Sequence, residues 1–376
     1  MGREATQNLA INKIDKAKFL ILELITGYGK TKVAIDTVNH VCSKYPSQSL
    51  SILILVARKV HKQTWLDEIN KWGGIKSTNI IFECYESLRK HAKETFDIVI
   101  ADECHHLSNK RLGILKSLTI NKAFIGLSAT IKRDMRKYFS EVYKAEFIRC
   151  GLKEAVNEDI LPEPTVYLIP LKLDNTQYNY KTKRFNRDVV TTQKGYYDIQ
   201  SSLIDWYKRK YMSTRNERIK NIWLSTAGKR LKWLAEQKES IILSLLDHLH
   251  SCKTLTFCSS IAQTERLGRY NITSKNKDSI NNLVKFNDNK IKHITACDIL
   301  NEGVNLTNCR VGIFCNLSSS EIVTKQRTGR ILRHKSPIII LPYFRQTREE
   351  EIINTILQEY SQSSIQIINS FNEIKL

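Results

Sequence analysis

The chain has 376 residues, of which 41% are hydrophobic and 26% are charged. This length and composition suffice for two domains with ordinary apolar cores, and they exclude a chain that is mainly disordered. Lys and Arg number 59 against 38 Asp and Glu, so the formal net charge is +21 and a polyanionic partner is the first kind to consider.

Signals for membrane insertion or secretion are not visible. The longest apolar runs, residues 51–57 and 337–342, are far shorter than the roughly 20 residues of a membrane-spanning helix. The first residues lack the apolar stretch of a secretory signal. Nine widely spaced cysteines without a C-x-x-C pair are typical of reduced thiols. We therefore expect a protein of the cytoplasm without membrane partners, in a bacterium or, if the source is viral, in its host.

The first 150 residues alternate short β-branched runs with amphipathic stretches, which is the pattern of a parallel α/β sheet. Strands are expected at residues 19–23, 51–56, 79–83, 98–101 and 123–126. Between the first two, apolar residues recur at helical spacing, so strand, turn and helix follow one another as in a βαβ crossover. The glycine-rich turn at residues 27–29 should therefore lie at the carboxyl end of the first strand.

That turn has the composition of a phosphate-binding loop, with the residues Thr26, Gly27, Tyr28, Gly29, Lys30 and Thr31. Its glycines permit positive φ and a close approach of the backbone to phosphate, the lysine reaches the outer phosphates, and the Thr31 hydroxyl is placed to ligate Mg²⁺. Leu24 stands where the consensus has glycine, so this motif alone leaves open a glycine-rich helix start without nucleotide.

Two adjacent acids, Asp102 and Glu103, follow the buried strand predicted at residues 98–101. At the carboxyl end of a strand, one carboxylate can hold Mg²⁺ while its neighbour orients or deprotonates the attacking water. The alternative is that these acids only begin a solvated loop. Beside Gly29, Lys30 and Thr31, the pair predicts hydrolysis of a nucleoside triphosphate.

The pattern changes between residues 171 and 240, where 16 Lys and Arg accompany 7 Asp and Glu and many aromatic residues. We expect a basic, mainly helical insert. Two interpretations stay open for its aromatic side chains: they stack on bases beside the positive charges, or they pack the insert onto its neighbours.

A second series of strands, at residues 254–258, 292–296, 310–315 and 337–341, predicts another parallel sheet. Pro162 and Pro164 mark the exit from the first domain. The predicted organisation is a first lobe at residues 1–150, a linker and insert at 151–240, and a second lobe at 241–376.

Four motifs in this order resemble those of the superfamily 2 helicases of the DExH type, and the resemblance covers almost the whole chain. Besides the phosphate loop they are Asp102-Glu103-Cys104-His105, Leu127-Ser128-Ala129-Thr130 and Gln326-Arg327-Thr328-Gly329-Arg330-Ile331-Leu332-Arg333. The additional His106 is similar to the branch that includes restriction-enzyme motor subunits and phage and DNA-repair helicases. The resemblance implies an α/β protein with two RecA-like lobes that bind ATP and Mg²⁺ between them.

The resemblance also implies roles for individual residues. It assigns catalysis to Lys30, Asp102, Glu103, Gln326, Arg330 and Arg333, Mg²⁺ binding to Thr31 and Asp102, and coupling of hydrolysis to movement to His105, Ser128 and Thr130. It assigns nucleotide binding to Arg3, Gln7, Thr26, Gly27, Gly29, Lys30, Thr31, Gly303 and Asn305, the first two for adenine. Two positions depart from the family pattern, because Cys297 stands where Thr is frequent and Asn305 where Asp is frequent.

Nucleic-acid contacts implied by the resemblance follow predicted strand ends, at Arg58, Lys59, Tyr85, Ser87, Ser259, Ser260 and residues 298–306. Side chains of these kinds contact phosphates without reading bases, so we expect binding that tolerates any sequence and weakens with salt.

The leading hypothesis is an ATP-dependent helicase or translocase that acts on DNA in replication, recombination or repair. DNA is favoured over RNA because of His106 and because no RNA-recognition module is appended. The alternatives are an RNA helicase, a motor subunit of a nuclease or restriction-type complex, and a basic binding module whose nucleotide site has decayed. The intact phosphate loop, acids and arginines argue against the last of these.

Overall fold

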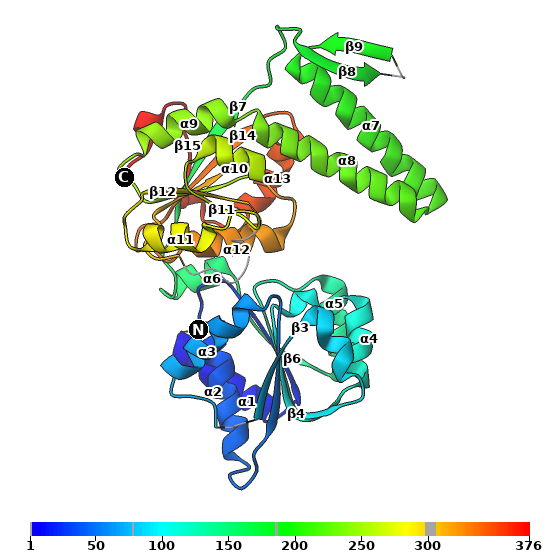
Figure 1. The fold of residues 1–376 in the computed structure, drawn as a ribbon, viewed down its shortest axis with the longest axis vertical. Coiled ribbons are helices and arrows are strands. Elements are labelled where there is room, and N and C mark those ends of the chain that lie inside the picture. The colour runs from blue at the N-terminus through cyan, green and yellow to red at the C-terminus, as the bar shows by residue number, and fades with distance from the viewer. Residues whose placement is uncertain (1, 77–78, 185–186, 298–305) are drawn as a thin grey trace. The chain divides into compact units, whose positions relative to one another are not determined.

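The computed structural model describes residues 2–76, 79–184, 187–297 and 306–376. The described chain divides into two compact units, whose helices and strands are labelled in Figure 1. The first unit comprises the residues up to Glu163 together with Glu321–Arg333, and the second comprises the rest from Pro164 onward.

The first unit contains a six-stranded, fully parallel sheet with the order β3-β2-β4-β5-β1-β6. Its strands are β1 (Phe19–Leu24), β2 (Ser51–Val56), β3 (Asn79–Cys84), β4 (Thr95–Asp102), β5 (Thr119–Ser128) and β6 (Glu146–Cys150). The five predicted strands of this region are confirmed. The edge strand β6 was missed, since it has only five residues and includes the charged Glu146 and Arg149.

Helices cover both faces of this sheet, with α1, α2 and α3 on one side and α4 and α5 on the other (Figure 1). The helices are α1 (Arg3–Ile14), α2 (Lys30–Ser43), α3 (Val60–Lys71), α4 (Asn109–Ser117), α5 (Arg133–Tyr143), α6 (Leu152–Asn157) and α12 (Glu321–Ile331), with the short 3-10 helices η1 (Tyr85–His91) and η2 (Cys104–His106). All six residues of β1 are buried, as expected for a central strand covered on both faces.

The second unit contains a seven-stranded parallel sheet with the order β11-β12-β10-β13-β14-β7-β15. Its strands are β7 (Thr165–Leu171), β10 (Thr254–Phe257), β11 (Asn271–Ile272), β12 (His293–Ala296), β13 (Val311–Phe314), β14 (Ile338–Phe344) and β15 (Ile365–Ile367). The four predicted strands are confirmed. Residues 165–171, predicted as linker, instead pair with β14 along their whole length. This strand was not predicted because it contains Pro170, and proline is rare within strands.

The remaining helices of the second sheet are α9 (Glu239–His248), α10 (Ile261–Leu267), α11 (Ser279–Asn287) and α13 (Arg348–Leu357), with the short η4 (Gln362–Ser364) and η5 (Phe371–Glu373). Apolar side chains from β7, β13, β14 and α9 form the core, including Tyr167, Leu245, Ile313 and Ile340. The prediction of two parallel-sheet lobes is confirmed.

Between β7 and α9 lies the insert, which consists of the hairpin β8 (Tyr180–Arg184) and β9 (Arg187–Thr191) and the two long helices α7 (Gln193–Thr214) and α8 (Glu217–Glu236). We call α7 and α8 the arm; Figure 1 shows α8 returning alongside α7. Side-chain caps from Thr192 and Asn216 begin the two helices. The mainly helical insert is confirmed, whereas its hairpin was not predicted.

The root of the arm is fixed by a buried ion pair. Lys238 Nζ lies 2.6 Å from Glu349 Oε1 and also donates to the carbonyl oxygen of Pro342 at 3.1 Å. The second carboxylate oxygen of Glu349 accepts from the Phe344 backbone N–H. Because both charges are satisfied, their burial is tolerated and the junction has one geometry.

Within the described ranges, no helix is both long and apolar enough to cross a membrane. The nine cysteines, each of which is described, form no disulfide.

Candidate nucleotide site

The glycine-rich turn forms a loop between β1 and α2, as the sequence predicted. Leu24, the departure from the consensus, is the last residue of β1 and is fully buried, so its side chain belongs to the core. Gly27 and Gly29 have φ values of 93° and 101°, a conformation that side-chain-bearing residues rarely adopt. Lys30 and Thr31 are the first residues of α2, whose N-terminal N–H groups attract anions.

Lys30 from this loop meets Glu103 from the end of β4. Lys30 Nζ lies 3.5 Å from Glu103 Oε1, and the two side chains are only 11% and 15% exposed. Among the described residues, neither Lys30 Nζ nor the buried Thr26 Oγ1 has a hydrogen-bond partner. Buried polar groups of this kind fit phosphate oxygens, which supply strong acceptors for both.

Glu103 itself has an unusual backbone, with φ at 50° in the left-handed region. A residue other than glycine in this conformation carries strain, which is found where the surrounding structure imposes a functional geometry. Its side chain points into the site because the chain turns sharply directly after β4.

Asp102 is the last residue of β4 and is held from two sides. Trp65 Nε1 on α3 donates to Asp102 Oδ2 at 2.9 Å, and the Tyr85 hydroxyl donates to the Asp102 carbonyl oxygen at 2.7 Å. Burial, and then the neighbouring Glu103 charge, raises the pKa of Asp102 to about 6. A divalent cation would favour the ionised form, so the residues fit the predicted Mg²⁺.

The role of Trp65 was not predicted, and it leads to a test. Trp65→Phe removes the donor to Asp102 while keeping an aromatic ring, so we expect the Mg²⁺ concentration for half-maximal ATP turnover to rise roughly 10-fold, as for other partners of metal ligands. Trp72→Phe is the matched control, because Trp72 Nε1 donates to Glu68 instead. An unchanged Mg²⁺ requirement in Trp65→Phe would contradict the assignment.

The three residues predicted to couple hydrolysis to movement form one hydrogen-bonded group next to Glu103. His105 Nδ1 lies 3.3 Å from Glu103 Oε2 and 3.0 Å from Ser128 Oγ. Ser128 Oγ donates to the Thr130 carbonyl oxygen at 2.8 Å. A change at Glu103 can therefore reach the end of β5 through direct contacts.

The motif at residues 326–333 lies on α12 and the two residues that follow it, and this segment belongs to the first unit. The Gly329 backbone lies against the phosphate loop so closely that a Cβ there would fall 2.3 Å from Thr26 Cβ. Gln326 and Arg330 are 2% and 7% exposed, whereas Arg333 is exposed. The glycine of this motif is thus required by packing against Thr26.

In the described structure, Arg3 and Gln7, the two residues of α1 predicted to bind adenine, form no hydrogen bond with each other. Arg3 Nη2 donates to the Ile160 carbonyl oxygen at 3.2 Å, and Gln7 is half-buried. Between them, Thr6 Oγ1 lies 2.5 Å from the Tyr28 hydroxyl, and both residues are buried. This contact, which was not predicted, ties α1 to the phosphate loop.

The predicted nucleic-acid contacts have different environments. Arg58 and Lys59 are exposed after β2, and Ser87 is half-buried in η1. Tyr85 must be corrected: it is 2% exposed and its hydroxyl is bonded to Asp102, so it supports the site from the core. Ser259 and Ser260 bond to Gln263 at the start of α10. Gly303, Asn305 and residues 298–305 as a whole lie outside the described residues.

Comparisons with known proteins identify related families. Residues 1–133 match the family model of the type III restriction enzyme res subunit, and residues 237–335 match that of the helicase conserved C-terminal domain. The DNA 3'-5' translocase XPB2 of Sulfurisphaera tokodaii is 26% identical, over 87% of this chain and 77% of that protein.

Solved structures show the same fold. Dbp5 of S. cerevisiae bound to RNA and ADP BeF3 matches with a TM-score of 0.60 and 12% identity, over 96% of this chain and 88% of that one. A fragment of a putative HsdR subunit of a type I restriction enzyme from Vibrio vulnificus matches with a TM-score of 0.61 and 18% identity, over 96% and 67%. With its ordered motifs and two parallel-sheet lobes, the chain belongs to the superfamily 2 helicases, which hydrolyse ATP.

Proposed function

We propose that the protein is an ATP-driven DNA translocase or helicase of the DExH type. The observation that carries the proposal is the pairing of Lys30 with Glu103 beside Asp102, after the carboxyl ends of β1 and β4, which flank β5 in the sheet. These residue types in contact are what phosphoryl transfer to water requires: a cation for the phosphates, a carboxylate for the metal and a second carboxylate for the water.

Each of these residues has its own role in ATP binding or hydrolysis. Lys30 and the N–H groups at the start of α2 hold the phosphates, and Thr31 and Asp102 hold Mg²⁺, which supplies charge neutralisation when bound. Glu103 orients the attacking water and accepts its proton. Arg330 and Arg333 bring permanent positive charge to the outer phosphate, because a guanidinium cannot lose its proton at neutral pH. Arg3 and Gln7 contact the adenine.

DNA is the proposed polymer. The relative XPB2 is described as a DNA 3'-5' translocase, and the restriction-enzyme model matches residues 1–133. The similar Dbp5 structure holds RNA, which keeps an RNA helicase as the second candidate. Cysteines that form no disulfide are consistent with our expectation that the protein acts in the cytoplasm.

A panel of ATPase assays tests the proposal. We expect turnover in the presence of Mg²⁺ to rise with single- or double-stranded DNA and to rise less with RNA of matched sequence. Strand displacement and translocation are then measured on the polymer that stimulates turnover. Stimulation by RNA alone would favour the RNA helicase, and flat turnover with every polymer would contradict a motor.

The arm offers a contact surface for the polymer in addition to Arg58, Lys59 and Ser87. Two sets of aromatic residues in the insert differ in their surroundings. At the root, Tyr180, Tyr196 and Trp233 pack against one another with ring centroids 4.8 to 5.8 Å apart. Farther along α7, Trp206 is 48% exposed, and the Lys210 ammonium lies 4.6 Å from its ring centroid. The root aromatics therefore pack the insert, while Trp206 is free to stack on a base.

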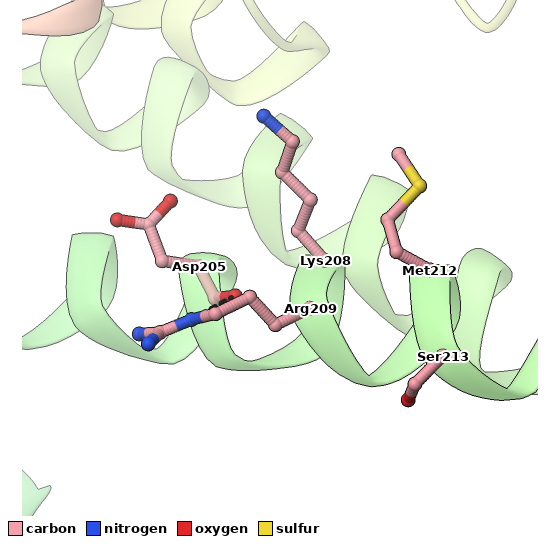
Figure 2. A pocket seen from close by; sticks show the side chains of 5 residues that line it. All are labelled: Asp205, Lys208, Arg209, Met212 and Ser213. Atoms are coloured by element: carbon pink, nitrogen blue, oxygen red, sulfur yellow. Dashed lines mark hydrogen bonds between the residues drawn. The ribbon is translucent and has the colours of Figure 1, made fainter.

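Further basic side chains lie on α7 near Trp206 in the sequence. Lys208 and Arg209 line an open hollow of about 500 Å³ with Asp205, Met212 and Ser213. Figure 2 shows Lys208 and Met212 projecting on the same side of the helix. An exposed ring beside positive charges is the combination by which proteins hold single strands without reading their sequence.

Substitutions in α7 test this surface. Trp206→Ala should weaken binding of a single strand by about 1 to 3 kcal/mol, and Lys210→Ala should lower the slope of log affinity against log salt by roughly 0.7. Lys194→Ala is the control, because the carboxylate of Asp198 already neutralises that lysine. Affinity and salt slope are measured by fluorescence anisotropy; equal effects of the three variants would exclude a specific contact.

A further inference from the structure

Glu23 is a buried acid that none of the proposed steps uses. It is the second-last residue of β1, between Leu22 and Leu24, and its side chain is only 9% exposed. Burying a carboxylate in an apolar strand is costly unless it is paired and hydrogen-bonded. The partners of Glu23 therefore indicate what its charge accomplishes.

Those partners come from two other segments of the first unit. Arg136 Nη2 on α5 lies 2.8 Å from both carboxylate oxygens of Glu23, and Arg149 Nε on β6 lies 3.0 Å from Oε2. The Ile131 backbone N–H donates to Glu23 Oε1 at 3.0 Å. The carboxylate is thus satisfied by two guanidinium groups and one main-chain donor.

Ile131 connects this cluster to the coupling residues, since it directly follows Thr130. Both of its main-chain polar groups are engaged: its N–H donates to Glu23, and its carbonyl oxygen accepts from Arg136 Nη2 at 3.3 Å. Glu23 also lies opposite Ser128 in the pairing of β1 with β5. We call Glu23 and Arg136 the clamp.

The segment 128–131 is consequently held at both ends. At Ser128 it is bonded to His105, which contacts Glu103. At Ile131 it is bonded to the clamp, and Glu23 precedes Thr26 of the phosphate loop by three residues. The clamp therefore joins the strand that carries the phosphate loop to the far end of the coupling segment.

We propose that Glu23 and Arg136 are positioning residues that hold segment 128–131 so that a change at Glu103 is transmitted through it. Glu23 acts through Ile131 on Thr130 and Ser128 and does not touch the nucleotide. Without the clamp, ATP is still bound and hydrolysed, but the far end of the segment is released and less movement results from each hydrolysis. This inference rests on the proposed motor function.

The variants Glu23→Gln and Arg136→Met test the clamp. Glutamine still accepts from Ile131 but loses the charge that holds both arginines, and these side chains are 31% and 62% exposed, so water can solvate them. We expect strand displacement or translocation per ATP hydrolysed to fall at least about fivefold, with ATP affinity within about twofold of the wild type. Arg136→Lys keeps the charge and should restore most of the coupling.

Asp97→Asn is the matched control for a merely structural effect. Asp97 lies near the amino end of β4 and accepts from the Ser51 backbone N–H and hydroxyl at 2.9 and 3.1 Å. It therefore anchors main chain in the same sheet, at the edge away from the phosphate loop. We expect Asp97→Asn to lower the melting temperature without lowering displacement per ATP.

Amide hydrogen exchange separates failure of the clamp from failure of the motor function. In Glu23→Ala, which removes the acceptor of the Ile131 N–H as well as the charge, exchange at Ile131 should accelerate while exchange within β5 stays unchanged, whether or not the polymer stimulates turnover. Unchanged exchange at Ile131 would overturn the clamp. Normal displacement per ATP in Glu23→Gln, or an equal loss in Asp97→Asn, would overturn its role in coupling.

Discussion

Replacing Lys30 with alanine should lower nucleic-acid-stimulated ATP turnover by roughly 100- to 1,000-fold or more, the loss that follows removal of one charged or polar group from a preorganised site. Lys30 Nζ is buried and is held 3.5 Å from Glu103 Oε1, so its ammonium is already placed for the phosphates. Alanine leaves the carboxylates of Asp102 and Glu103 without this cation. ATP affinity should therefore fall together with turnover.

Lys32→Ala is the control for Lys30→Ala. Lys32 lies two residues farther along α2 and forms an ion pair with Asp36 one turn away. Its loss should change turnover by less than about twofold, since partly exposed pairs of this kind contribute little to stability. Turnover and affinity for a fluorescent ATP analogue are measured for both variants. Near-normal turnover in Lys30→Ala would contradict the nucleotide site.

Replacing Glu103 with glutamine should lower ATP turnover at least roughly 100-fold, because the amide accepts no proton at neutral pH. ATP affinity should stay within a few-fold of the wild type, because the amide has nearly the same shape as the carboxylate. The phosphate loop is unchanged by this substitution. The variant should consequently accumulate with bound ATP, which is visible in filter binding of labelled nucleotide.

Glu86→Gln is the control for Glu103→Gln. Glu86 is an exposed acid in η1 that pairs with Arg111 at 3.4 Å. Because an exposed pair contributes little, turnover should stay near that of the wild type. If Glu103→Gln hydrolyses ATP at a normal rate, another residue accepts the proton. If it loses ATP binding as well, Glu103 acts chiefly by positioning Lys30.

The sequence predicted the central strands well and the edges of the sheets poorly. Interior strands such as β1 and β2 are almost entirely apolar, with Glu23 and Ser51 as the exceptions, because they are covered on both faces. The missed strands β6, β11 and β15 are short edge strands, and β7 includes a proline. Their pairing depends on neighbours that are distant in the chain, so local pattern carries little information about it.

Predictions for the residues of the candidate site also failed where the outcome depends on distant neighbours. Tyr85 was expected to contact nucleic acid because it follows a predicted strand end, yet it supports Asp102 from the core. Position after a strand says which edge of the sheet a residue is near. It does not say whether the side chain faces solvent, since that depends on which helices pack above it.

By itself, the sequence determined the phosphate loop, the adjacent acids and the order of the motifs, because these features depend on neighbouring residues: glycines that adopt positive φ, a lysine at a helix start and acids at a strand end. Only the tertiary structure decided that Trp65 holds Asp102, that Thr6 bonds to Tyr28 and that Glu23 holds Ile131. These partners are 37, 22 and 108 residues apart, and no spacing rule relates them. The folding of the chain brings each polar group to its partner, since an isolated buried polar group is costly.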